Sequence, residues 1–283
     1  MNTTKNRVVN DPLAVIYNEG LWRVCRVSPL FNLQSSALKY KQYASKIRQA
    51  IARNVPSSSG IKYLVQLEDQ PYLKYSEDDP QSFSITVTSS QGNKTKVIYM
   101  CIFLSWGVSS KVTQAIHLPF MLEHGEQKIA TTVRATLQNI FDCNIKQFCF
   151  SQHQLLQFAF NIVEIDTSRS TDPITFCYRI QGDHKNNLHL SVEFGDINLI
   201  WNGIKGDFAK PLDKITLAYH IIQNQIFYTI MLDVTPLALH EIKLSKAEVK
   251  SNGTIKMKTP DIVNSVFTVL NEIIGYNNKE TNN

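Results

Sequence analysis

The side chains that could perform acid–base or nucleophilic chemistry are scattered along this sequence. His117 and His124 bracket a Leu-Pro-Phe segment, and His184 lies in a polar turn beside Asp183. A histidine acts as a general base when a nucleophile lies within hydrogen-bond reach, and no hydrolase or nucleotide-binding motif places one here. Loop histidines of this kind usually cap helices or face solvent. We therefore expect no catalytic residue and no enzymatic activity.

Cysteines and carboxylates could also form reactive or metal-binding sites. Cys143 follows Asp142 directly, but an adjacent acid raises the pKa of a thiol and so disfavours the nucleophilic thiolate. The five cysteines include no C-x-x-C pair, and their odd number indicates free thiols in a reducing compartment. Glu77, Asp78 and Asp79 could hold a hard cation, although a solvated acidic loop explains them more simply. The sequence predicts no metal site and no cofactor.

A stretch free of acidic residues, from Gly20 to Leu67, is the main charge feature of the chain. Within it Ser35 and Ser36 offer N-caps for a helix over 36–53, whose apolar residues recur at helical spacing. The cations of this helix fall on two lines of sevenfold spacing, namely Lys39, Lys46 and Arg53, and Lys41 and Arg48. An unrelieved positive face of this kind can bind the DNA backbone. The alternative is a solvated helix whose neutralising acids come from elsewhere in the fold.

The hydrophobic pattern predicts an α+β chain of mostly antiparallel sheets with helices packed on one face. Strands are expected at 21–27, 61–67, 83–88, 97–106, 174–180, 188–194, 226–233, 237–246 and 254–258. Helices are expected at 36–53, 126–141, 152–163, 199–204, 212–225 and 263–274. Asn252-Gly253 is the strongest hairpin signal in the chain.

We expect two lobes. The first covers 11–165 and contains the basic helix, the second covers 172–276 and is rich in strands, and 277–283 form a disordered tail. The sequence shows no apolar core like that of a secretory signal and no apolar run of about 18 residues, so we expect no membrane span.

The strands of the second lobe suggest a surface for a protein partner. The segment 226–233 is apolar on both of its alternating faces, and 237–246 adds apolar residues that we place near a sheet edge. An exposed edge can accept a strand from a partner through backbone hydrogen bonds. The alternative is that the last helix covers these strands internally. The residues proposed for partner binding are Ile230, Leu232, Leu237, Leu239, Ile242 and Leu244.

Three blocks of the sequence together resemble the centromere protein L (CENP-L) family. The first block consists of Trp22, Val24, Val27, Ser28, Pro29, Leu30, Phe31 and Leu33. The second runs from Leu118 to Cys143, and the third is Asn252-Gly253-Thr254-Ile255-Lys256 with the helix after it. Each block is mostly core and turn residues, and it is their order and spacing that carry the resemblance.

The resemblance implies an elongated mixed fold with sheets similar to those of the TATA-box-binding protein. It also implies a nuclear, non-enzymatic subunit of the inner kinetochore, whose C-terminal half pairs with a CENP-N-like protein. Further implied partners are the other subunits of the constitutive centromere-associated network, CENP-A chromatin and centromeric DNA, with a role in kinetochore assembly and chromosome segregation. The alternative reading of the chain is a stand-alone nucleic-acid-binding protein or a metal-dependent nuclease of mixed α/β type.

Overall fold

The computed structural model describes residues 13–18, 20–55, 61–92, 94–107, 115–165, 171–180, 187–204 and 211–280. The strands are β1 Leu21–Val27, β2 Lys62–Asp69, β3 Phe83–Gln91, β4 Lys94–Leu104, β5 Phe120–Gly125, β6 Ile145–Gln147, β7 Ile174–Arg179, β8 Asn187–Val192, β9 Ala238–Lys243, β10 Ala247–Lys250 and β11 Thr254–Met257. The helices are α1 Ala14–Asn18, α2 Ala37–Asn54, α3 Gln127–Phe141, α4 Gln152–Ile165, α5 Phe194–Gly203, α6 Pro211–Ile230 and α7 Pro260–Glu280. The α+β class predicted from the sequence is confirmed.

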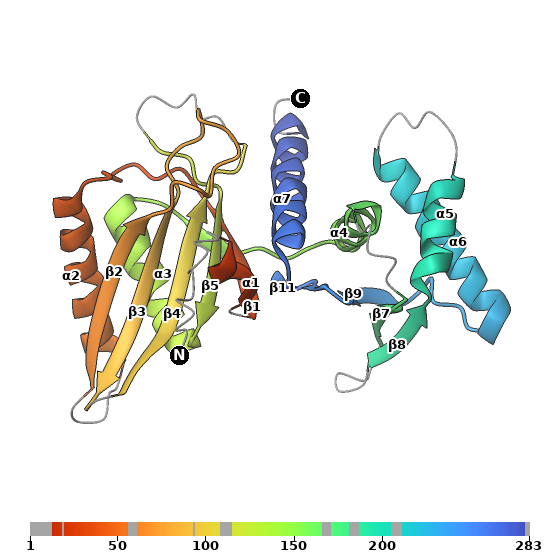
Figure 1. The fold of residues 1–283 in the computed structure, drawn as a ribbon, viewed down its shortest axis with the longest axis horizontal. Coiled ribbons are helices and arrows are strands. Elements are labelled where there is room, and N and C mark those ends of the chain that lie inside the picture. The colour runs from red at the N-terminus through yellow and green to blue at the C-terminus, as the bar shows by residue number, and fades with distance from the viewer. Residues whose placement is uncertain are drawn as a thin grey trace, which may run out of the picture.

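The described strands form one sheet in the order β2-β3-β4-β5-β1-β11-β10-β9-β7-β8, and β6 pairs with β1 beside this path. Every pairing in it is antiparallel. Strand β1 lies at the middle, with Arg23 opposite Glu123 of β5 on one side and Leu21 opposite Lys256 of β11 on the other. The first and last strands of the chain therefore join the two halves of the sheet. Figure 1 shows the resulting elongated molecule.

One face of strands β1–β5 is covered by helices α2 and α3, at one end of the molecule (Figure 1). Cys101 and Phe103 of β4 point to this side and belong to the same buried cluster as the two helices. Tyr43 of α2 meets Phe141 of α3 edge to face, with ring centroids 5.1 Å apart. The Tyr40 hydroxyl also donates a hydrogen bond to Asp69 at the edge strand β2. Helix α2 is thus held against the sheet by its apolar face, and its other face is exposed to solvent.

The opposite face of the central strands contributes to a second, larger cluster. Ile102 and Leu104 of β4 alternate with Cys101 and Phe103, so they point to the other side, where Phe267 of α7 belongs to the same cluster. Helices α4, α5 and α6 complete this cluster over strands β7 and β9. The helices therefore cover opposite faces in the two halves of one continuous sheet. The domain boundary expected between 165 and 172 stays a prediction. Helix α4, which precedes it, packs with α6 and α7, which follow it.

The largest error in the sequence-based elements concerns 226–233, which was predicted to be a strand. Helix α6 instead continues through Ile230, because Ile222 and Ile226 extend its buried face at a spacing of four residues. Met231 ends it in the left-handed region, with φ 55°, and its N–H donates to the Phe227 carbonyl at 2.8 Å. Strands β5, β6 and β10 were missed, and α7 reaches Glu280, four residues into the tail predicted to be disordered.

Candidate interaction surfaces

The five predicted DNA-contacting cations lie on two flanks of helix α2, with Lys39, Lys46 and Arg53 on one side of its buried face and Lys41 and Arg48 on the other, since residues two positions apart point in nearly opposite directions. Ser36 caps the helix by accepting a hydrogen bond from the Lys39 N–H at 3.3 Å, as predicted. Lys41, Lys46, Arg48 and Arg53 are exposed and Lys39 is half-buried. From Lys39 to Arg53 the axis spans about 21 Å at a rise of 1.5 Å per residue. The helix therefore offers two rows of cations, one on each flank, rather than a single point of positive charge.

These five cations stay uncompensated within the part of the chain that the structure describes. None of them forms an ion pair with a described carboxylate, whereas Arg23, in the same acid-free stretch, pairs with Glu123. Asp69 lies beside the helix but accepts its hydrogen bond from Tyr40. Burial and this hydrogen bond raise the pKa of Tyr40 to about 12, so the phenol stays protonated as a donor. Among the described residues, Glu68 and Asp69 of β2 therefore lie beside the helix, but neither forms an ion pair with any of the five cations.

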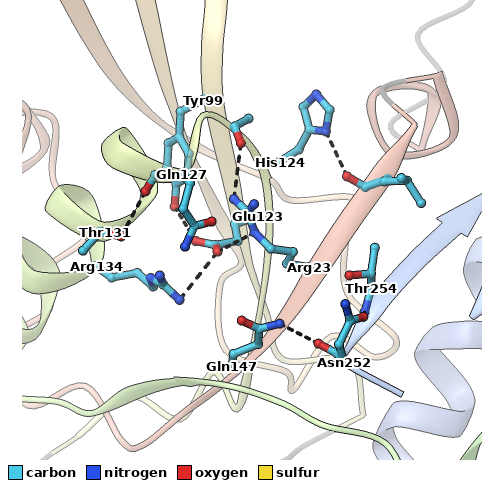
Figure 2. Close-up of polar contacts among 12 residues, drawn as sticks. Arg23, Tyr99, Glu123, His124, Gln127, Thr131, Arg134, Gln147, Asn252 and Thr254 are labelled. Carbon is cyan, nitrogen blue, oxygen red and sulfur yellow. Dashed lines mark hydrogen bonds and ion pairs between the residues drawn. The ribbon is translucent and has the colours of Figure 1, made fainter. Parts of the chain in front are cut away.

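A buried charge network, which sequence analysis missed, lies between β1, β5 and α3. The Glu123 carboxylate is fully buried, with Oε1 2.9 Å from Nε of Arg23 and 3.7 Å from Nη1 of Arg134. The Tyr99 hydroxyl donates to Oε2 at 3.2 Å, and Figure 2 shows Glu123 held between the two arginines. The acid is satisfied by a charge-assisted hydrogen bond from Arg23, by the Tyr99 hydroxyl and by the ion pair with Arg134, so the network fixes structure. The signal in the sequence is a single charge inside the apolar run Pro-Phe-Met-Leu-Glu.

The residues considered for catalysis do not converge. The Nδ1–H of His124 donates a hydrogen bond to the Leu21 carbonyl at 2.9 Å, and His117 lies in a separate pocket beside Arg26. His184 is outside the described residues. Burial and, secondly, Asp142 raise the pKa of Cys143 to about 11, so this thiol is not activated. All five cysteines are free, as predicted.

The acidic loop before β3 contains one carboxylate with a clear structural role. Asp79 is buried and accepts hydrogen bonds from the backbone N–H groups of Tyr75 and Ser76, from the Ser76 hydroxyl and from the N–H of Gly107 at 2.7 Å. Burial raises its pKa, but these hydrogen bonds together outweigh burial and lower it. Glu77 and Asp78 stay exposed. Among the described residues, no three His, Cys, Asp or Glu side chains gather as a metal site would need.

The residues predicted to bind a partner fall into two groups. Leu239, Ile242 and Leu244 are buried in the second cluster. Strand β9 lies between β10 and β7, so the prediction that this segment lies near a sheet edge was wrong. The remaining residues are more accessible: Leu232 and Leu237 are half-buried, and Ile230 at the end of α6 is 52 % exposed.

The accessible apolar surface of this half lies instead between α6 and β8. Strand β8 pairs with β7 alone among the described strands, so its outer edge is open. A groove of about 280 Å³ runs between them, lined by Leu190 and Val192 of β8 and by Ile226 and Ile230 of α6. The end of α6 and the residue that follows it also carry exposed apolar side chains, namely Phe227, Tyr228 and Met231.

The fold and these surfaces define an α+β protein with one continuous antiparallel sheet, a cationic helix at one end and an apolar groove at the other. Within the described ranges, no helix is long and apolar enough to cross a membrane. The chain belongs to the centromere protein L family, whose model matches residues 16–281. The members of this family are structural kinetochore proteins, and membership implies that the chain localises to the centromere. No curated protein matches the chain closely.

Proposed function

We propose that this chain is a non-enzymatic subunit of the inner kinetochore that pairs with a CENP-N-like protein. The pair would join the other subunits of the constitutive centromere-associated network on CENP-A chromatin in the nucleus, and so support kinetochore assembly and chromosome segregation. The observation that carries the proposal is the family match over residues 16–281, nearly the whole chain. A match of this extent covers both the cationic helix and the apolar groove.

The surface that we propose for the CENP-N-like partner is the β8 edge together with the last turn of α6. Tyr228 and Met231 are 79 % and 77 % exposed, an unusual position for two large apolar side chains that are close in sequence. On the groove side of α6, the open β8 edge supplies backbone donors and acceptors, and the groove supplies side-chain pockets. These are the elements that strand addition by a partner requires.

This proposal replaces part of the surface expected from the sequence. Leu239 and Ile242 are core residues, and a charge on either would destabilise the fold before it affected a partner. Ile230 remains in the proposed surface because it lines the groove. Leu232 and Leu237 pack against the second cluster and support the segment that follows α6.

We further propose that α2 contacts DNA phosphates in the assembled complex. Lys39, Lys41, Lys46, Arg48 and Arg53 would position the duplex without reading its sequence, since phosphate contacts carry no base information. Their lack of ion pairs with described carboxylates supports this role. The same observation supports the second candidate function, a stand-alone nucleic-acid-binding protein, in which this helix would bind DNA without a partner.

Recovery of the tagged chain from cells separates these two functions. In the proposed function, a CENP-N homologue and other inner-kinetochore subunits co-purify with the chain in nearly equal amounts. Recovery of the chain with nucleic acid but with no CENP-N homologue would favour the stand-alone function. The experiment needs no knowledge of the interface, so it tests membership of the complex separately from the surfaces proposed above.

A further inference from the structure

A second pocket, of about 330 Å³, opens where β1 ends beside β6 and the segment before β5. One side of it is basic, with Arg26 of β1, Lys146 of β6 and His117. The other side is apolar, with Val27, Pro29 and Ile274 of α7. None of these residues belongs to the α2 surface or to the α6–β8 groove.

The two charged residues of the pocket lie directly side by side. Arg26 and Lys146 are cross-strand partners in the antiparallel β1–β6 pair, and both are exposed. Like charges placed opposite each other destabilise a sheet. Neither forms an ion pair with any carboxylate in the described part of the chain. The fold thus maintains a concentrated positive charge that nothing described in this chain neutralises.

The remaining polar side chains of the pocket can each donate a hydrogen bond. Burial and the nearby Arg26 lower the pKa of His117, so at neutral pH its ring is uncharged and offers one N–H. The backbone N–H of Asn144 donates a hydrogen bond to the Ser28 hydroxyl at 2.9 Å, which joins two segments that line the pocket. The Asn144 side chain is exposed. A ligand that accepts several hydrogen bonds and carries negative charge matches this set of groups.

We propose that the pocket binds the phosphoryl group of a phosphorylated serine or threonine in a protein partner. The guanidinium of Arg26 suits two phosphoryl oxygens, and Lys146 adds a point charge. The apolar side at Val27, Pro29 and Ile274 receives the methylene groups of the same residue and its neighbour in the peptide. A DNA duplex fits this site less well. Its convex backbone suits exposed rows of cations such as those of α2, whereas this pocket is concave and half apolar.

Titration of the full chain with N-acetyl-phosphoserine N-methylamide, followed by NMR, tests the proposal. Saturable shifts are expected for residues of β1 and β6, and the unphosphorylated serine analogue should cause none. The double variant Arg26→Glu with Lys146→Glu should weaken binding at least tenfold. The matched control reverses two exposed lysines of β4, Lys94→Glu with Lys96→Glu, and should keep the affinity of the unaltered chain.

A pair of single variants guards against a trivial loss of folding. Arg26→Gln and Lys146→Gln each remove one of two opposed like charges, so each should keep or raise the melting temperature while weakening phosphoserine binding. Unchanged phosphoserine affinity in both would overturn the proposal, as would an equal loss in the β4 control. The proposal is also overturned if Arg26→Glu with Lys146→Glu abolishes binding of a 20-base-pair duplex but leaves phosphoserine binding intact. In that case the pocket is part of a DNA surface.

Discussion

Oε1 of the buried Glu123 lies 2.9 Å from Nε of Arg23, and this contact joins β5 to β1 at the centre of the sheet. Arg134 reaches the same oxygen from α3, so the carboxylate also ties the covering helix to the sheet. The ion pair sits where the two halves of the molecule meet, because β1 also pairs with β11. The stability of the whole sheet should therefore depend on it.

Replacing Glu123 by Gln should lower the free energy of unfolding by about 3 kcal/mol, because two largely buried guanidiniums lose their counter-charge. Urea unfolding followed by circular dichroism measures this. The control is Glu248→Gln, which removes the acid of the more exposed pair with Lys256 at 3.7 Å and should cost under about 1 kcal/mol. Equal effects of the two substitutions would show that the buried pair has no special role.

Reversing Lys39, Lys46 and Arg53 to Glu should weaken DNA binding by the assembled complex and reduce its salt dependence. Each lost phosphate contact removes about 0.9 from the slope of log affinity against log salt. Fluorescence anisotropy with a duplex at several salt concentrations gives both quantities. Reversal of the exposed Lys62, Lys94 and Lys96 makes the same change in charge at β2 and β4 and serves as the control. If both triple variants behave alike, only the total charge matters and α2 has no specific contact.

Asp79 should contribute stability that depends on pH. Its folded pKa is lowered below the usual 3.8, so the charged form is favoured by folding. The contribution is then complete above the unfolded pKa and is lost as pH falls through the folded value. At pH 7, Asp79→Asn should cost about 2 kcal/mol, and this difference from the unaltered chain should shrink below pH 4. Unfolding experiments at pH 7 and pH 3 test it, with the exposed Asp78→Asn as the control; a difference that does not change with pH would contradict the assignment.

Gly253 should be the least replaceable residue of the β10–β11 hairpin. Its φ is +81°, and an added Cβ would lie 1.9 Å from the Phe148 carbonyl oxygen, while its own carbonyl accepts the Val24 N–H at 2.8 Å. Gly253→Ala should therefore lower stability by about 2 kcal/mol or more, through strain and the displaced backbone. Thermal unfolding measures the change. Gly203→Ala, which meets no atom within 4 Å and lies in α5, should be neutral or slightly stabilising.

The sequence predicts the local features of this fold well. Helix α2 was predicted within one residue at each end, because the Ser36 cap and the spacing of Tyr43, Ile47 and Ile51 are signals within the segment itself. The Asn252-Gly253 turn is equally local, and the structure has it between β10 and β11. The two rows of cations on α2 follow from the same helical spacing.

The neighbours of a strand could not be predicted, because they depend on pairing between distant parts of the chain. Strand β9 was placed near an edge, yet β7 covers its outer side, and the actual edge is β8. The alternating apolar residues of 226–233 fit a strand, but tertiary packing of Ile222 and Ile226 extends α6 instead. The pocket beside β1 and β6 was missed for the same reason, since Arg26 and Lys146 become neighbours only when β1 pairs with β6.

The central claim, pairing with a CENP-N-like protein through α6 and β8, is tested most directly by reconstitution of the heterodimer. We would co-express the chain with its CENP-N homologue and measure the mass of the complex by light scattering after size-exclusion chromatography. Tyr228→Glu with Met231→Glu should abolish the heterodimer while the free chain keeps its circular dichroism spectrum, because both side chains are largely exposed. Tyr72→Glu, at a residue 76 % exposed in the other half, should leave it intact. A heterodimer of normal mass with both charges present would contradict this account.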